Sequence, residues 1–186
     1  NEELTIAASV QKISRDLQSR NMSYEILIVD DGSTDATVAR VERLHDAHIR
    51  LLRHEKNLGK GAAVKSGMLA ARGAARVFID ADLQIHIENL DRFWEPLHKG
   101  ADVIIASSPD APSGARFWAR GILGFLAKKL IRFVMGWDIP DTQRGLKMFR
   151  DVAAVDIFSS IKVCGWGFDI EVLAIAMARK YKIEQI

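Results

Sequence analysis

Four short apolar runs, separated by segments with helical periodicity, limit the fold of this chain more than any other feature of its sequence. The helical segments lie at about residues 3–20, 35–46, 60–71 and 87–97, where apolar residues recur every three or four positions. Strands that alternate with helices in this way form βαβ units. The alternation therefore predicts an α/β fold, with a mostly parallel central sheet flanked by helices. The runs that we expect to form its buried strands are residues 25–31, 48–53, 75–80 and 102–107.

The later part of the chain follows a different pattern. Residues 115–135 read as one long helix and residues 168–179 as another, with a loop or short strand at 141–147 between them. The 186 residues suffice for one domain with a sizeable core, so we expect residues 1–186 to form a single domain. Because the chain opens in a helix start and stops in a strand start, we expect an excerpt that lacks a first strand and a C-terminal part.

Composition excludes several classes of protein. A net charge of only +2 gives no global attraction to nucleic acid, so we expect no nucleic-acid partner. The single cysteine, Cys164, excludes an internal disulfide and a cysteine-based zinc cluster, and the five histidines never share the spacing of metal ligands. The sequence has no signal peptide and no apolar run near the ~18 residues that span a bilayer, which makes the cytosol the default compartment.

Two carboxylates end the third apolar run. Asp80 and Asp82 flank a single alanine where the strand should finish. Ligands bind just outside the carboxyl ends of strands in open α/β sheets, and paired carboxylates there can hold a hard divalent cation. Capping of the next helix is the plainer alternative, but two such close negative charges repel each other unless a cation or a proton lies between them. We therefore predict a Mg²⁺ or Mn²⁺ site at Asp80 and Asp82.

A second strand end carries a doubled carboxylate. Asp30 and Asp31 follow the first apolar run, and capping of the next helix does not account for both. A carboxylate at this place can accept hydrogen bonds from a nucleobase or a ribose. Because the carboxyl ends of parallel strands meet at one edge of a sheet, we expect Asp30 or Asp31 to share a crevice with Asp80 and Asp82.

Two basic features are less specific. The segment Asn57–Gly61 is either a phosphate cradle at a helix start, with Lys60 near a diphosphate, or a flexible helix start, and it lacks the spacing of a P-loop. The basic residues of the 115–135 segment fall four apart among aromatic residues. This helix therefore either exposes a solvated face or lies on a membrane surface.

Taken together, these motifs resemble a known family. The segments Asp30–Asp35, Lys60–Gly61 and Asp80–Asp82 resemble family 2 glycosyltransferases, which have the GT-A nucleotide-diphospho-sugar transferase fold. The pattern Asp-Thr-Gln-x-Gly-x-Lys-x-Phe at 141–149 and the run Phe168–Glu171 are similar to dolichyl-phosphate β-glucosyltransferases and related polyprenyl-phosphate transferases. The resemblance covers nearly the whole chain. Dolichyl-phosphate mannose synthases are close relatives, but their equivalent of the 141–149 pattern differs more.

The chain departs from the family at two places. Residues 107–109 are Ser-Ser-Pro where the family usually has Gly-Ser-Arg, which removes a positive charge expected near the acceptor phosphate. Arg116, Arg120 and Arg144 are the candidates to supply that charge, since arginine can bind a phosphate with two parallel hydrogen bonds. Arg144 itself stands where eukaryotic members often have cysteine.

The resemblance implies an inverting, metal-dependent transfer of a hexose, glucose from UDP-glucose, to a polyprenyl phosphate of the dolichyl type. It implies a catalytic domain at the cytoplasmic face of a membrane, held there peripherally or by segments outside this chain. Asp169 is either a general base, as in relatives with hydroxyl acceptors, or a group that orients the sugar. The residues implied as catalytic are Asp82, Gln143 and Asp169. Those implied as ligands of the substrates are Asp30, Asp31, Lys60, Asp80, Gln84, Arg116, Arg120, Arg144 and Lys147, with the metal on Asp80 and Asp82.

Three alternative functions stay open. The first is a polyprenyl-phosphate mannose synthase that uses GDP-mannose. The second is a family 2 transferase with a saccharide hydroxyl as acceptor, which would need Asp169 as a true base. The third is a non-catalytic membrane-surface or nucleotide-binding module, against which the predicted metal pair argues.

Overall fold

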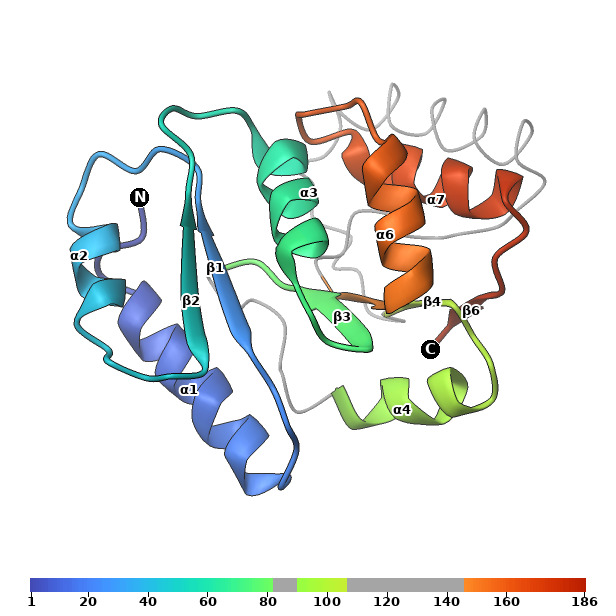
Figure 1. The fold of residues 1–186 in the computed structure, drawn as a ribbon, viewed down its shortest axis with the longest axis horizontal. Helices are drawn as coiled ribbons and strands as arrows, with labels where there is room; N and C mark the ends of the chain where they lie inside the picture. The colour runs from blue at the N-terminus through green and yellow to red at the C-terminus, as the bar shows by residue number, and fades with distance from the viewer. Residues whose placement is uncertain (82–89, 107–145) are drawn as a thin grey trace, which may run out of the picture.

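The computed structural model describes residues 1–81, 90–106 and 146–186 (Figure 1). Within these ranges, strands and helices alternate from β1 to β4 as the apolar periodicity predicts. The predicted helix at 115–135 lies outside the described residues. So do six of the predicted site residues, namely Asp82, Gln84, Arg116, Arg120, Gln143 and Arg144.

The N-terminal part of the chain builds a two-stranded parallel sheet. Its strands pair so that Asp30 lies opposite Arg53 at the carboxyl end. The two helices of this part pack a small apolar cluster, formed by Ile6, Val10 and Val41, against the strands. The elements are α1 (Ile6–Ser19), β1 (Ile26–Asp30), α2 (Thr37–Glu42) and β2 (Ile49–Arg53).

A second, mixed sheet has the strand order β3-β5-β4-β6. β5 runs antiparallel to β3 and β4, whereas β6 runs parallel to β4. The reversed strand begins at Lys147, which pairs with both Phe78 and Ile105, so Lys147 lies at the carboxyl ends of β3 and β4. The strands are β3 (Ala75–Phe78), β4 (Val103–Ile105), β5 (Lys147–Arg150) and β6 (Ile183–Gln185).

The helix α3 joins the two sheets, because it packs against β1 and β3 as well as against α6 and α7 (Figure 1). The largest core cluster lies beneath α6 and α7, where the rings of Phe78, Phe149, Phe158 and Phe168 contact one another. The sequence prediction missed α6. The remaining helices are α3 (Lys60–Ala70), α4 (Asp91–His98), α6 (Asp151–Ser160) and α7 (Phe168–Ala178).

The helices of the described residues are short, and α1 has only 14 residues. None of them combines the length and the apolar character needed to cross a membrane.

Candidate functional site

The carboxyl ends of β1 and β3 bring together the acidic residues singled out in the sequence. Asp30 is the last residue of β1, and Asp80 follows β3 by two residues. Lys147 begins β5 at the same edge of the mixed sheet, and Asp169 lies in the first turn of α7. Strands hold Asp30 and Lys147, and a helix holds Asp169, so regular elements position three of these four residues.

Lys147 and Asp169 form a buried ion pair in this region. The Nζ atom of Lys147 lies 2.6 Å from Oδ1 of Asp169, with Lys147 0% and Asp169 5% exposed. Burial raises the pKa of Asp169 above its ordinary value, and the positive charge of Lys147 opposes that rise. The charges of Lys60 and Asp80 act on the same pKa, in opposite directions. These four side chains therefore form one electrostatic cluster.

The role predicted for Lys147 needs revision. We expected it to bind a substrate, but its ammonium group is fully buried and paired with Asp169. Its ammonium also lies 5.2 Å from the centre of the Phe78 ring. Lys147 is thus a charge partner that fixes Asp169, and not a side chain open to a phosphate.

A second ion pair, between Lys60 and Asp80, is partly open to solvent. Lys60 Nζ lies 2.9 Å from Oδ1 and 3.0 Å from Oδ2 of Asp80, whose side chain is 41% exposed. The same ammonium lies 4.7 Å from the centre of the Trp166 ring. Lys60 was predicted near a diphosphate, and the structure places it directly beside the predicted metal ligand Asp80.

The metal prediction fits Asp80 but extends beyond the described residues. Among residues 1–81, 90–106 and 146–186, no three acidic, histidine or cysteine side chains gather as a metal site would require. Asp80 is a solvent-accessible carboxylate, the kind of oxygen ligand that a hard divalent ion prefers, although the ammonium of Lys60 now contacts both of its oxygens. The second predicted ligand, Asp82, lies outside the described residues. The assignment of Mg²⁺ or Mn²⁺ to this pair stays a prediction.

Asp30 lines a cavity of about 250 Å³ at the end of β1. Its carboxylate is buried and accepts a hydrogen bond from the backbone N–H of Ser33 at 3.3 Å. Ala81, which separates Asp80 from Asp82, lines the same cavity. The cavity at the end of β1 thus reaches the residue next to Asp80. That Asp30 and Asp80 act in one crevice stays a prediction.

Asp31 is occupied by contacts within the protein. Its Oδ1 lies 2.7 Å from Nδ1 of His54 and accepts the N–H of Leu58, while its Oδ2 accepts the N–H of Gly59. Burial alone would raise the pKa of Asp31, but these hydrogen bonds outweigh it and hold the pKa below its ordinary value. The sequence left Asp30 and Asp31 as equal candidates for the nucleoside. Both line the cavity at the end of β1, and the choice between them stays a prediction.

The loop before α3 does not form a phosphate cradle. Besides the two N–H groups bound to Asp31, those of Gly61 and Ala62 both donate to the carbonyl oxygen of Cys164, at 2.7 and 3.3 Å. A Cβ atom at Gly61 would lie 2.4 Å from the carbonyl oxygen of Val163, so glycine is required there. The start of α3 is therefore closed by the α6–α7 loop, and Lys60 is the first residue of this helix.

Sequence reasoning missed the residues that fix this loop. Glu171 accepts the backbone N–H groups of Lys162 and Val163 at 2.9 and 2.7 Å. His54 links Asp31 to Ser66 on α3, with its Nε2 atom 2.9 Å from the serine oxygen. Trp166 was not singled out either. Glu171 belongs to the run Phe168–Glu171 that the sequence singled out, although its contacts were not predicted, and Trp166 lies three residues before Asp169. Nothing in the sequence around His54 indicates its contacts.

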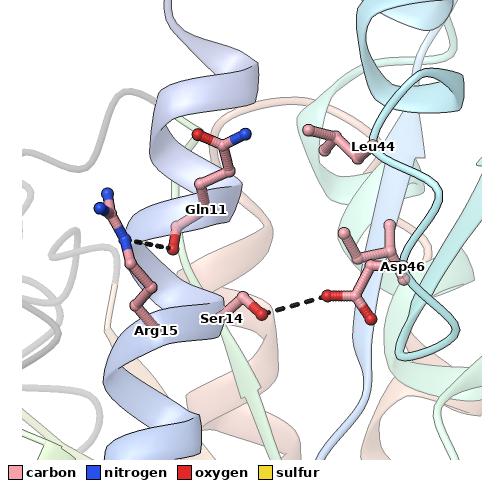
Figure 2. A pocket seen from close by; sticks show the side chains of 6 residues that line it. Gln11, Ser14, Arg15, Leu44 and Asp46 are labelled. Carbon is pink, nitrogen blue, oxygen red and sulfur yellow. Dashed lines mark hydrogen bonds between the residues drawn. The ribbon is translucent and has the colours of Figure 1, made fainter.

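A separate cavity of about 200 Å³ lies between α1 and the turn before β2 (Figure 2). Ser14 donates a hydrogen bond to Asp46 across it at 3.2 Å, and Arg15 donates to the carbonyl oxygen of Gln11. This cavity lies at the start of β2, which is the opposite end of the parallel pair from Asp30. It is therefore not part of the acidic site.

Comparison with known sequences connects this geometry to a family. The profile of the family described as glycosyl transferase family 2 matches residues 1–158. Three of the similar curated proteins are named dolichyl-phosphate beta-glucosyltransferase. They come from Dictyostelium discoideum (31% identity over 95% of this chain), Drosophila melanogaster (34% over 89%) and Homo sapiens (30% over 88%). The chain spans only 57%, 55% and 55% of their respective lengths.

Solved structures share the fold. Glucosyl-3-phosphoglycerate synthase from Mycobacterium tuberculosis, in complex with Mn²⁺, uridine diphosphate and phosphoglyceric acid, superposes with a TM-score of 0.69 at 24% sequence identity. A second crystal structure of the same synthase gives a TM-score of 0.72 at 22% identity. The matches cover 100% of this chain and 64% and 66% of the other chains. They confirm the predicted GT-A architecture.

Proposed function

Because the chain belongs to glycosyl transferase family 2, we propose that it transfers glucose from UDP-glucose to a polyprenyl phosphate of the dolichyl type. The relatives named dolichyl-phosphate beta-glucosyltransferase support the sugar and the acceptor. The observation that carries the proposal is that the Asp30 cavity reaches Ala81, the residue next to Asp80, whose carboxylate pairs with Lys60, while Lys147 holds Asp169. A nucleoside, a diphosphate and a sugar each find a suitable partner among these residues.

The Asp30 cavity is the proposed nucleoside site. A buried carboxylate only accepts hydrogen bonds, and both the N–H of uracil and the hydroxyls of ribose can donate them. The cavity of about 250 Å³ is too small for a whole nucleotide sugar, so the diphosphate and the hexose would extend past Ala81 toward Asp80. This direction leads away from the base and toward Lys60.

Asp80 and Asp82 are the residues that would hold a divalent cation. When bound, the cation supplies neutralising charge to the departing diphosphate. Lys60 stands beside Asp80 and adds a further positive charge at the same place. The M. tuberculosis synthase crystallised with Mn²⁺ and uridine diphosphate suggests which cation and base to test first.

The proposed reaction inverts the anomeric carbon. An oxygen of the acceptor phosphate forms the new bond from one face, and the bond to the diphosphate breaks on the opposite face, so that UDP leaves with the electron pair. A phosphate is already anionic at neutral pH, and no proton has to be removed from it. Asp169 then has the role of orienting the sugar or of stabilising positive charge at the anomeric carbon, with Lys147 fixing its position.

A saccharide hydroxyl is the second candidate acceptor. The raised pKa of Asp169 favours it, because a general base works best when its pKa approaches the working pH. The ion pair with Lys147 argues the other way, since it favours the charged carboxylate and occupies one of its oxygens at 2.6 Å. We therefore give preference to the phosphate acceptor.

The acceptor requires contact with a membrane. We propose that the chain works at the cytoplasmic face, and that Arg116, Arg120 or Arg144 receives the lipid phosphate. These three arginines lie outside the described residues, so their role rests on the sequence alone.

The test is a panel assay on the full-length parent protein. Radiolabelled UDP-glucose, UDP-galactose and GDP-mannose are each incubated with Mn²⁺ and either a short polyprenyl phosphate or a soluble saccharide. We expect label from UDP-glucose to enter the organic phase with the lipid. Labelling from GDP-mannose would replace the donor assignment, and labelling of the saccharide alone would establish the hydroxyl acceptor with Asp169 as base.

A further inference from the structure

Trp166 is a large apolar side chain that the fold leaves exposed beside the site. It is 76% exposed, in the loop between α6 and α7. Large aromatic side chains are usually buried or engaged at an interface, and an exposed one next to a polar site is informative. No role in the fold of the described residues explains its position.

The loop that carries Trp166 is fixed to the rest of the protein at several points. Glu171 holds its beginning through the N–H groups of Lys162 and Val163. The carbonyl oxygen of Cys164 accepts two N–H groups from the start of α3. In Figure 1 this loop lies next to the N-terminal end of α3, as these bonds require. The indole is thus presented by an anchored loop.

Lys60 connects the indole to the acidic site. Its ammonium lies 4.7 Å from the centre of the Trp166 ring and 2.9 Å from Asp80. The ring and the predicted metal ligand therefore both lie near one positive charge. A cation near an aromatic face is attracted by the negative face of the ring, which helps to hold the Lys60 ammonium in place. At 76% exposure, the ring keeps a broad surface open to solvent and to a ligand.

We propose that the indole of Trp166 is the platform for the hexose of the nucleotide-sugar donor. This inference rests on the proposed function, because it requires a donor whose base occupies the Asp30 cavity. A diphosphate attracted to Lys60 carries its hexose to the neighbourhood of the ring. One face of a hexopyranose consists largely of C–H groups with slight positive charge, which complements the negative face of an indole. Trp166 would then contribute to recognition of the sugar and leave recognition of the nucleotide to Asp30.

The test separates sugar binding from nucleotide binding. Isothermal titration of the full-length protein with UDP and with UDP-glucose, both with Mn²⁺ and without acceptor, measures the two affinities. In Trp166→Ala we expect binding of UDP-glucose to weaken by about three- to tenfold, the range that an aromatic contact accounts for, while binding of UDP stays unchanged. Trp166→Phe keeps an aromatic face and should retain most of the affinity for UDP-glucose.

Val163→Ala is the matched control, because Val163 is an exposed apolar residue of the same loop. It should leave both affinities unchanged. Equal weakening of UDP and UDP-glucose in Trp166→Ala, or no weakening of either, would overturn the sugar platform. Reduced binding to phosphatidylserine-containing vesicles with unchanged donor affinities would overturn it in favour of a membrane anchor. If the wild-type protein binds neither UDP nor UDP-glucose, the proposed function fails first, and the inference falls with it.

Discussion

Replacement of Lys147 by methionine tests the buried ion pair. The ammonium of Lys147 is 0% exposed and lies 2.6 Å from an Asp169 that is itself 5% exposed, so solvent cannot compensate for its removal. Loss of one partner of a buried pair costs about 3–5 kcal/mol, because the other charge stays buried without compensation. We expect the free energy of unfolding of Lys147→Met to fall by this amount at neutral pH. In the double variant with Asp169→Asn no charge remains, and part of the loss should be recovered.

The same variant has a predicted pH dependence. Burial raises the pKa of Asp169 in the folded state above the value of about 3.9 of an unfolded aspartate, so protonation favours the folded state. This stabilisation is complete below the unfolded pKa and is lost as the pH rises through the folded pKa. Removal of Lys147 removes the two largest influences that lower the folded pKa of Asp169, so the loss should extend to higher pH. The instability of Lys147→Met should therefore diminish in acid.

Urea unfolding of the single and double variants at about pH 5 and about pH 8 measures both effects. The design isolates the pair, since the double-variant cycle subtracts whatever each substitution does elsewhere. If Lys147→Met is no less stable than the double variant at pH 8, the two charges are not coupled. The account of a fixed Asp169 would then be refuted.

Three further substitutions test other parts of the site. Gly61→Ala places a Cβ 2.4 Å from a backbone carbonyl oxygen and should destabilise the protein by about 1–3 kcal/mol in thermal unfolding. The control Gly165→Ala adds a Cβ that meets nothing within 4 Å and should be neutral. Equal melting temperatures of the two variants would contradict the closed start of α3. Asp82→Asn should lower metal-dependent turnover at least about a hundredfold and leave the circular dichroism spectrum unchanged. Full activity of this variant would refute the assignment of Asp82 as a metal ligand. Arg120→Ala should raise the KM for polyprenyl phosphate about tenfold with little change in that for the donor, and a selective effect on the donor would refute its role.

The sequence predicted the elements that position the site. The apolar runs at 25–31 and 75–80 became β1 and β3, and the cavity beside Asp30 at the end of β1 is also lined by Ala81, which follows Asp80. The missed helix α6 was within reach of the same reasoning. Its buried residues are Ala153, Ala154, Ile157 and Phe158, which recur at helical spacing.

Other features could not be read from the sequence, because they depend on contacts between distant segments. The burial of Lys147 follows from the reversed direction of β5, which places Phe78 and Ile105 on either side of it. The use of both Asp31 oxygens depends on the β2–α3 loop returning to the end of β1. Periodicity locates strands and helices, but it does not give strand order or loop conformation.

The most direct test is metal-dependent transfer by the full-length parent and its Asp80→Asn variant. Radiolabelled UDP-glucose and a short polyprenyl phosphate are incubated with Mn²⁺ or with EDTA, and label is counted in the organic phase. The account predicts labelled lipid only for the wild-type protein with Mn²⁺, and a β-linked glucose in the product. Labelled lipid in EDTA, or equal transfer by Asp80→Asn, would contradict the claim that the ends of β1 and β3 form the donor and metal site.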